Sequence, residues 1–135
     1  MFRILLADDE GIMLESLKKI ITTSFGSECD IRCVKTGRGV VEMAESFHPD
    51  IAFVDIHMPG LSGIQAIQEI RKVDKEMMII IITAYDKFAY AKEAVNLGVM
   101  EYLTKPISNK KIILERMHES HAAGGGSQTE EKRRP

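Results

Sequence analysis

Five short apolar segments, separated by stretches with helical periodicity, constrain the fold of this chain more than any other feature of its sequence. The apolar segments cover residues 2–7, 30–35, 51–55, 78–83 and 101–104. The helical stretches cover residues 12–25, 40–47, 64–73, 87–97 and 108 to about 118 or 121. Strict alternation of strand and helix with short connections predicts a parallel sheet that is covered by helices on both faces.

The composition of the five predicted strands indicates their order in the sheet. The first, third and fourth strands are almost wholly apolar, as is typical of strands buried on both faces. The second strand contains Asp30, Arg32 and Lys35, and the fifth contains Glu101 and Thr104, so both belong at the edges. This pattern predicts a flavodoxin-like (βα)5 three-layer sandwich with strand order 2-1-3-4-5. In such a sheet the ligand crevice lies outside the carboxyl ends of the strands, between the first and the third.

Composition and charge exclude several classes of protein. The chain has 135 residues, of which 44% are hydrophobic and 28% charged, a balance typical of one compact domain. Its formal net charge of −2 gives no general attraction to nucleic acid or anionic membranes. The longest apolar run, 77–82, is too short to cross a bilayer, and the N-terminus lacks a signal-peptide pattern. We therefore expect a cytoplasmic protein that binds neither nucleic acid nor membrane.

The composition changes near residue 122. The sequence AAGGGSQTEEKRRP contains three glycines and scattered charges, but no large apolar residue. Because such a segment cannot form a core, we expect residues 1–121 to be the domain and residues 122–135 to be a flexible tail or linker.

The chain contains two cysteines, Cys29 and Cys33. Their spacing along a predicted strand is too long for a comfortable disulfide. We therefore expect two reduced thiols, with Cys33 packed in the core.

Polar residues follow four of the predicted strands at the point where each strand ends. Asp8 and Asp9 follow the first strand, Asp55 ends the third, Thr83 ends the fourth and Lys105 follows the fifth. Because parallel strands place their carboxyl ends at one edge, three carboxylates, a hydroxyl and an ammonium are expected in one crevice. Taken singly, each residue fits an ordinary helix cap or turn. Their joint placement is hard to obtain from turn chemistry alone.

This set of groups limits the chemistry of the crevice. Carboxylates without thiolate or imidazole ligands favour a hard cation, Mg²⁺ or Mn²⁺, which would remove the repulsion among Asp8, Asp9 and Asp55. A carboxylate beside a metal and a lysine can act as a nucleophile toward phosphorus. The metal and Lys105 would neutralise charge on the phosphoryl oxygens, and the Thr83 hydroxyl could donate a hydrogen bond to one of them. The residues therefore predict an aspartyl phosphate on Asp55.

Over about residues 2–120 the sequence resembles the receiver domain of bacterial two-component response regulators. The matching motifs are LLADDE, VDIHMPGLSG, IIITAYD and YLTKPI. By position, the resemblance implies that Asp55 is the phosphoacceptor. It also implies that Mg²⁺ is held by Asp8, Asp9, Asp55 and the backbone carbonyl of His57.

The resemblance further implies a conformational switch. Thr83 and Lys105 would contact the phosphoryl group, and the Lys105–Pro106 peptide bond would be cis. On phosphorylation, Thr83 would move toward the phosphoryl group and Tyr102 would turn inward behind it. Residues 86–120 would then provide the surface for a homodimer.

The partner that the resemblance implies is a sensor histidine kinase, and the expected output is transcription control. The stretch AYDKFAYAKEAVNLGVMEYLTKPI is similar to receivers joined to AraC-like DNA-binding domains. The chain would catalyse only its own phosphorylation and dephosphorylation.

Two other functions remain as alternatives. A small aspartyl-phosphate phosphatase or phosphotransferase would usually have a second Asp two residues after the nucleophile, where this chain has His57. A flavin carrier of this fold needs a hydroxyl- and glycine-rich loop after the first strand, where this chain is acidic.

Overall fold

The computed structural model describes residues 1–84, 88–105 and 110–122, and strands alternate with helices along the chain as predicted. The strands are β1 (Phe2–Ala7), β2 (Cys29–Val34), β3 (Ile51–Val54), β4 (Met78–Thr83) and β5 (Glu101–Thr104). The helices are α1 (Gly11–Phe25), η1 (Gly26–Glu28, a 3-10 turn), α2 (Gly37–Ser46), α3 (Gly63–Arg71), α4 (Phe88–Asn96) and α5 (Lys110–Ala122). The tail predicted for residues 122–135 lies, from residue 123 on, outside the described residues.

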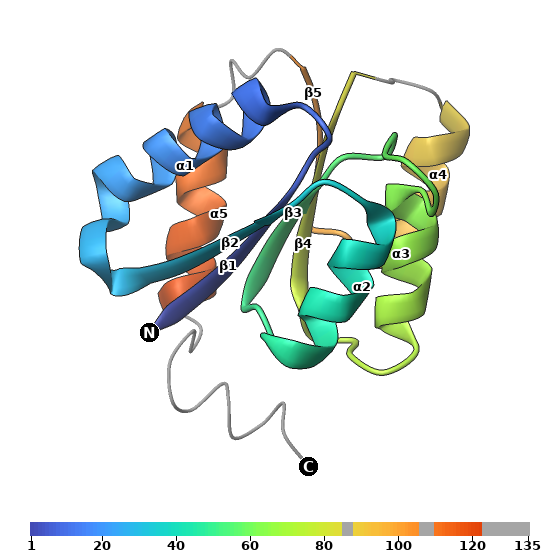
Figure 1. The fold of residues 1–135 in the computed structure, drawn as a ribbon, viewed down its shortest axis with the longest axis horizontal. Helices are drawn as coiled ribbons and strands as arrows, with labels where there is room; N and C mark the ends of the chain where they lie inside the picture. Colours follow the sequence, from blue (N-terminus) through green and yellow to red (C-terminus); the bar gives the residue numbers. More distant parts are fainter. Residues whose placement is uncertain (85–87, 106–109, 123–135) are drawn as a thin grey trace.

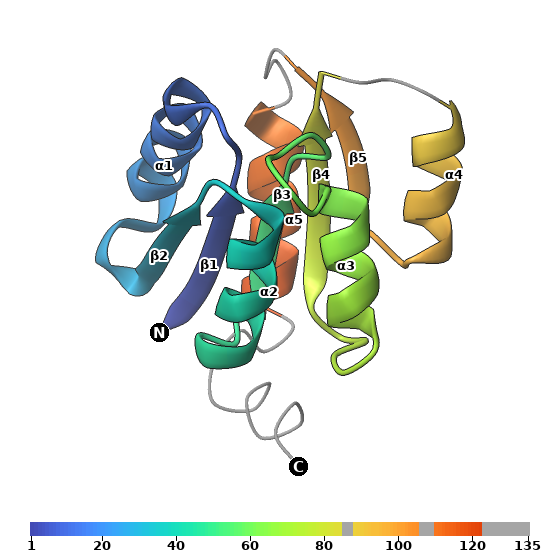
Figure 2. The ribbon, with the colours of Figure 1, turned by 45° about the vertical axis from the view of Figure 1, so that its right-hand side comes forward.

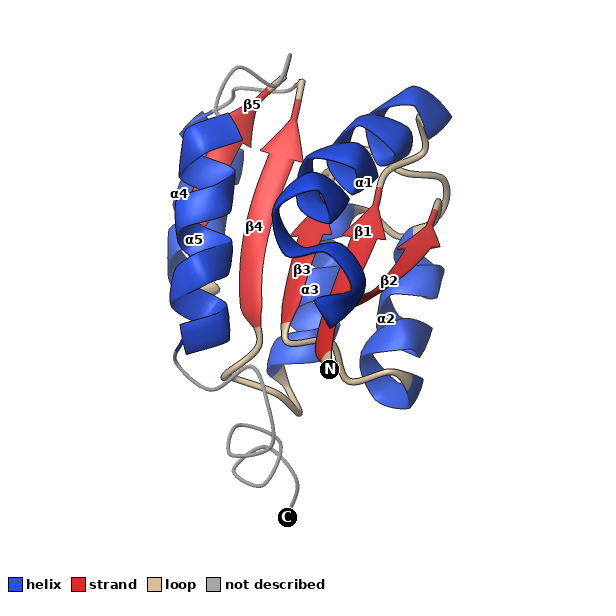
Figure 3. Cartoon of the chain, turned by 90° about the vertical axis from the view of Figure 1, so that its left-hand side faces the viewer, coloured by secondary structure: helices blue, strands red, loops and turns tan. Residues whose placement is uncertain are grey.

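The five strands form one parallel sheet in the order β2-β1-β3-β4-β5, which confirms the predicted flavodoxin-like topology. Helices α1 and α5 cover one face of the sheet, and α2, α3 and α4 cover the other (Figures 1 and 3). The mixed strands β2 and β5 are at the edges, because only the three central strands have both faces fully covered.

No helix in the described ranges is long and apolar enough to cross a bilayer.

Alternation along the strands divides the core into two layers. In β1, Phe2, Ile4 and Leu6 pack under α1 and α5, whereas Leu5 and Ala7 pack under α2 and α3. This alternation follows from the period of two residues in a strand. Both layers therefore hold β1 and β3 rigidly, and the residues that follow these strands start from fixed backbone positions.

The third helix is shorter than predicted. The structure ends α3 at Arg71, and Val73, the last residue of the predicted stretch 64–73, is 80% exposed. The helix ends because the Asp74 carboxylate accepts hydrogen bonds from the backbone N–H groups of Glu76 and Met77, both at 2.9 Å. A side chain that bonds nearby backbone donors favours a turn over another helical turn.

The prediction for the cysteines is half right. Cys29 and Cys33 are both free thiols, but Cys33 is exposed rather than in the core. It lies on the edge strand β2, where α1 covers the sheet only in part, and it lines an open groove. Cys29 is half-buried, and its burial, together with the nearby Glu28 carboxylate, raises the pKa of its thiol to about 11.

Candidate functional site

The carboxyl ends of the parallel strands meet at one edge of the sheet, as Figure 2 shows. After β1, β3 and β5, the first residue beyond the strand donates a backbone hydrogen bond to the neighbouring strand. The N–H of Asp55 donates to the Ala7 carbonyl at 2.9 Å, and the N–H of Lys105 donates to the Thr83 carbonyl at 2.8 Å. The N–H of Asp8 donates to the Val34 carbonyl at 3.1 Å. Because the ladder continues past the strand ends, these side chains start from fixed points.

The Lys105 ammonium is the centre of the site. Its Nζ lies 2.9 Å from Asp8 Oδ2, 3.3 Å from Asp55 Oδ2 and 2.5 Å from Glu10 Oε1. The Asp8 and Asp55 side chains are 2% and 5% exposed, and that of Lys105 is 11% exposed, so these charges are largely removed from water. The predicted convergence of Asp8, Asp55 and Lys105 is confirmed.

Burial and hydrogen bonding shift the pKa values of Asp8 and Lys105 in opposite directions. Burial raises the pKa of Asp8, although hydrogen bonds from the Glu10 N–H and Lys105 lower it in part. Burial would lower the pKa of Lys105, but its hydrogen bonds to Glu10 and Asp8 and the charge of Asp55 outweigh this effect and raise it. The lysine therefore carries its charge at any physiological pH, whereas ionisation of Asp8 is opposed by its surroundings.

The site has the donor set of a hard cation. Carboxylate oxygens of Asp8, Asp9 and Glu10 lie within 4.8 Å of one another. Asp55 Oδ1 is buried and has no hydrogen-bond partner among the described residues. A buried carboxylate oxygen without a partner is unfavourable, and a divalent cation would supply the missing interaction. The oxygens present fit Mg²⁺, which prefers a few carboxylates and retained waters.

The remaining predicted residues occupy different places around the site. Asp9 is exposed beside Asp8, and Thr83 is fully buried at the end of β4. The His57 ring is exposed on the loop after β3, in edge-to-face contact with Tyr90 of α4 at 6.0 Å between ring centroids. Tyr102 is half-buried in β5 against the α2–α3–α4 layer of the core. The predicted cis bond at Lys105–Pro106 lies outside the described residues, because Pro106 is not described.

Glu10 belongs to the site, although its position in the sequence predicted no role for it. The residue is at the N-cap position of α1, yet its side chain makes no capping hydrogen bond. The carboxylate reaches Lys105 instead, across 95 positions of sequence. The third consecutive acid in LLADDE is the sequence signal for this contact, because Glu is a poor N-cap and local helix capping does not explain it.

The loop that follows Asp55 is held by a close backbone contact. The Gly63 N–H donates to the Ile56 carbonyl at 2.7 Å. A Cβ at position 63 would lie 2.1 Å from the Asp55 carbonyl oxygen. Only glycine therefore fits at the start of α3 without displacing Asp55.

Replacing Gly63 with alanine is expected to lower the free energy of unfolding by about 1–3 kcal/mol, because the new methyl group collides with backbone that cannot rotate away. Urea unfolding followed by circular dichroism measures the loss. Gly11→Ala is the matched control, because its Cβ would meet nothing closer than the Lys35 ammonium at 3.8 Å. We expect this control to leave stability unchanged or raise it slightly, since alanine favours a helix more than glycine. Equal losses in the two variants would contradict the argument.

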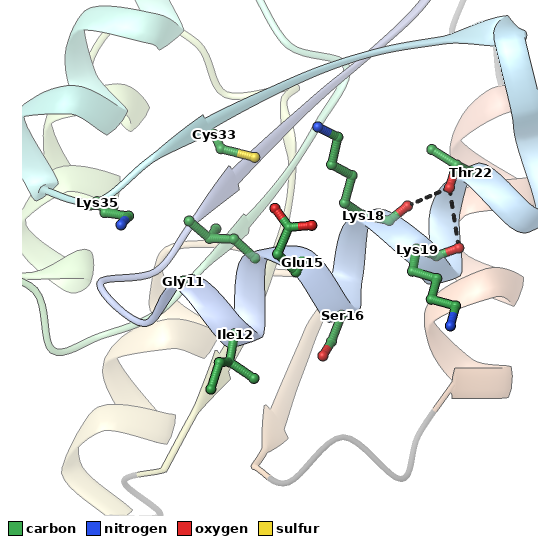
Figure 4. Close-up of a pocket in the computed structure, with 10 residues that line it drawn as sticks. Gly11, Ile12, Glu15, Ser16, Lys18, Lys19, Thr22, Cys33 and Lys35 are labelled. Carbon is green, nitrogen blue, oxygen red and sulfur yellow. Dashed lines mark hydrogen bonds between the residues drawn. The ribbon is translucent and has the colours of Figure 1, made fainter.

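An open groove of about 1070 Å³ lies beside the site, between α1 and β2 (Figure 4). Its lining includes Lys18, Lys19, Lys35, Glu15 and Cys33. Asp8, Asp55 and Lys105 do not line it, so the groove and the charged site are separate features.

The comparisons with known proteins agree with this site. The response regulator receiver domain family matches residues 4–116, and the chain belongs to this family.

Individual relatives support the same assignment. The chain is 34% identical over 113 residues to the uncharacterized transcriptional regulatory protein YesN of Bacillus subtilis, covering 84% of this chain and 31% of that protein. It is 36% identical over 111 residues to the chemotaxis protein CheY of Thermotoga maritima, covering 82% and 91%. A solved structure from Borrelia burgdorferi, the CheX-CheY-BeF3-Mg complex, matches with a TM-score of 0.74, 27% identity and 87% coverage of each chain. The chain thus spans nearly all of a CheY and less than a third of YesN.

Proposed function

We propose that this chain is a signalling switch that accepts a phosphoryl group on Asp55 from a sensor histidine kinase in an Mg²⁺-dependent reaction. The burial and the contacts of the Asp55 carboxylate support the proposal most directly. It is 5% exposed, one oxygen lies 3.3 Å from the Lys105 ammonium, and the other has no partner among the described residues. A carboxylate held in this way is positioned to react and to contact a cation.

The proposed reaction assigns a role to each group. A carboxylate oxygen of Asp55 attacks phosphorus while the bond from phosphorus to the donor nitrogen of a phosphohistidine breaks. Asp8, Asp9, Asp55 and the His57 carbonyl would hold Mg²⁺, which supplies positive charge to the phosphoryl oxygens. Lys105 adds a second positive charge, and the buried position of Thr83 suits a hydroxyl that contacts the product. The Borrelia relative, whose structure was solved with BeF3 and Mg²⁺, supports this reading.

The proposed switch extends from the site to α4, β5 and α5. Tyr102 lies half-buried on β5, where it can turn further inward when Thr83 moves. Residues 86–120 would form a homodimer in the phosphorylated state, and Val95 of α4, which is 76% exposed, offers apolar surface for it. Since YesN is named a transcriptional regulatory protein, the proposed output is transcription control through a DNA-binding domain, such as an AraC-like one. This chain would bind no nucleic acid itself.

The proposed chemistry is limited to the chain's own acyl phosphate, which it forms and hydrolyses. The alternative of a phosphatase that acts on other substrates is not favoured. Such an enzyme usually has a second Asp as general acid two residues after the nucleophile, where this chain has His57, whose ring contacts Tyr90.

The mass of the intact chain after incubation with acetyl phosphate tests the proposal. We expect a gain of one phosphoryl group with Mg²⁺ and none with a chelator. Asp55→Asn should abolish the gain, because an amide is a poor nucleophile. The control Asp30→Asn, which changes an exposed ion pair with Arg32 on β2, should be phosphorylated like the wild type. Phosphorylation of Asp55→Asn, or phosphorylation of the wild type without a divalent cation, would overturn the proposal.

A further inference from the structure

The Lys105 ammonium has three N–H donors, and in this structure three carboxylates occupy them. Glu10 is the nearest partner, at 2.5 Å, followed by Asp8 at 2.9 Å and Asp55 at 3.3 Å. The phosphoacceptor is thus the most distant of the three. The lysine has no donor left for a further oxygen unless one of the carboxylates releases it.

The three partners differ in how easily they can leave. Asp8 and Asp55 are almost fully buried, so breaking either pair would leave a carboxylate out of water and without its counter-charge. The Glu10 side chain is 60% exposed and makes no helix-capping bond, so its carboxylate can return to water. The Glu10 backbone stays in place, because its N–H donates to Asp8 Oδ1 at 2.9 Å.

Phosphorylation would add hydrogen-bond acceptors next to the Lys105 ammonium. A phosphoryl group on Asp55 brings three strong acceptor oxygens and additional negative charge next to Nζ. We propose that Glu10 is a positioning residue that holds Lys105 in the unphosphorylated chain and must release it before the lysine can contact the phosphoryl group. This inference rests on the proposed function and adds to it a residue that opposes the phosphorylated state.

A different role for Glu10 has to be separated from this one. Its carboxylate lies within 4.8 Å of those of Asp8 and Asp9, so it could bind the cation directly. If Glu10 is a metal ligand, removing its carboxylate changes the affinity for Mg²⁺. If it is a partner of Lys105, removal changes the affinity for a phosphoryl mimic instead. Loss of a ligand weakens Mg²⁺ binding, whereas release of Lys105 strengthens binding of a phosphoryl mimic.

The experiment measures the affinity of beryllofluoride, an anionic phosphoryl mimic, by calorimetry at Mg²⁺ concentrations that saturate each variant. Glu10→Gln and Glu10→Asp are both expected to bind it about threefold more tightly than the wild type, the scale of a partly exposed ion pair. Aspartate keeps the charge but withdraws it by about 1.5 Å, one bond length, beyond the reach of Lys105. Glu15→Gln is the matched control, because it removes an exposed carboxylate from α1 that makes no ion pair among the described residues. It should bind like the wild type.

Each other outcome has a distinct meaning. Tighter binding by Glu10→Gln but not by Glu10→Asp would assign the effect to net charge and overturn the proposal. Unchanged binding in both Glu10 variants would also overturn it, and so would a tenfold or greater loss of Mg²⁺ affinity in Glu10→Gln, which identifies a ligand. If the wild type fails to bind beryllofluoride with Mg²⁺, the proposed function itself fails. Circular dichroism confirms the fold of each variant, which we expect because position 10 is exposed.

Discussion

Lys105→Met is expected to lower the free energy of unfolding by about 3 kcal/mol at neutral pH in metal-free buffer, because it leaves buried carboxylates without their counter-charge. The Asp8 and Asp55 side chains are 2% and 5% exposed and both lie within 3.3 Å of the lysine Nζ. Methionine has a similar shape and volume, so the effect reports the missing charge rather than a cavity. Urea unfolding in the presence of a chelator measures it.

The pH dependence of this loss follows from the pKa values. The pKa of Lys105 is raised in the folded chain, so its contribution to stability is fully present below its ordinary value of about 10.4 and is lost as the pH rises above that value. At neutral pH the wild type therefore has the whole contribution. The difference between variant and wild type should shrink in acid, as the carboxylates become protonated and no longer need the lysine.

A surface lysine provides the control for this prediction. Lys72 pairs with Glu69 at 2.6 Å, but both side chains are exposed. Lys72→Met should change the free energy of unfolding by less than about 1 kcal/mol, as is usual for exposed pairs. Added Mg²⁺ should restore part of the stability of Lys105→Met by binding only the folded chain. A loss in Lys105→Met no larger than that in Lys72→Met would show that water screens the site.

The sequence predicted those parts of the site that depend on the backbone. Asp8, Asp55 and Lys105 meet because each follows a strand of the parallel sheet, and the strand order follows from which strands are apolar. The positions of these residues therefore need no knowledge of side-chain conformation.

The features that the sequence did not predict depend on where side chains extend and on how fully helices cover the edge strand β2. Glu10 contacts a residue 95 positions away, which no local pattern encodes. Val73 has the spacing of an apolar helix face, but the Asp74 side chain ends the helix first. Cys33 alternates like a core residue on a strand that proved to be only partly covered. Tertiary structure decided the outcome for Glu10 and Cys33, whereas a local bond from side chain to backbone decided it near Val73.

Asp8→Asn is expected to have the opposite effect on stability from Lys105→Met. Burial raises the pKa of Asp8, so the folded chain binds this proton more tightly than the unfolded chain. Ionised Asp8 therefore reduces stability at neutral pH, and this penalty disappears as the pH falls below the ordinary value of about 3.9. Asparagine keeps the Oδ1 acceptor that the Glu10 N–H uses at 2.9 Å. We expect a gain of roughly 0.5–2 kcal/mol at neutral pH, as is common when a functional site is relieved of an unfavourable group.

The same substitution should remove the response to Mg²⁺. Thermal unfolding of the wild type is expected to shift upward when Mg²⁺ is added, since binding stabilises only the folded chain, and Asp8→Asn should show little shift. Asp50→Asn is the matched control, because Asp50 is also buried but bonds the Arg3 N–H, away from the site. That control should retain the Mg²⁺ shift and gain no stability. If Asp8→Asn instead unfolds more easily at neutral pH, the ion pair with Lys105 outweighs burial, and the acid is retained for the stability of the fold rather than for the cation.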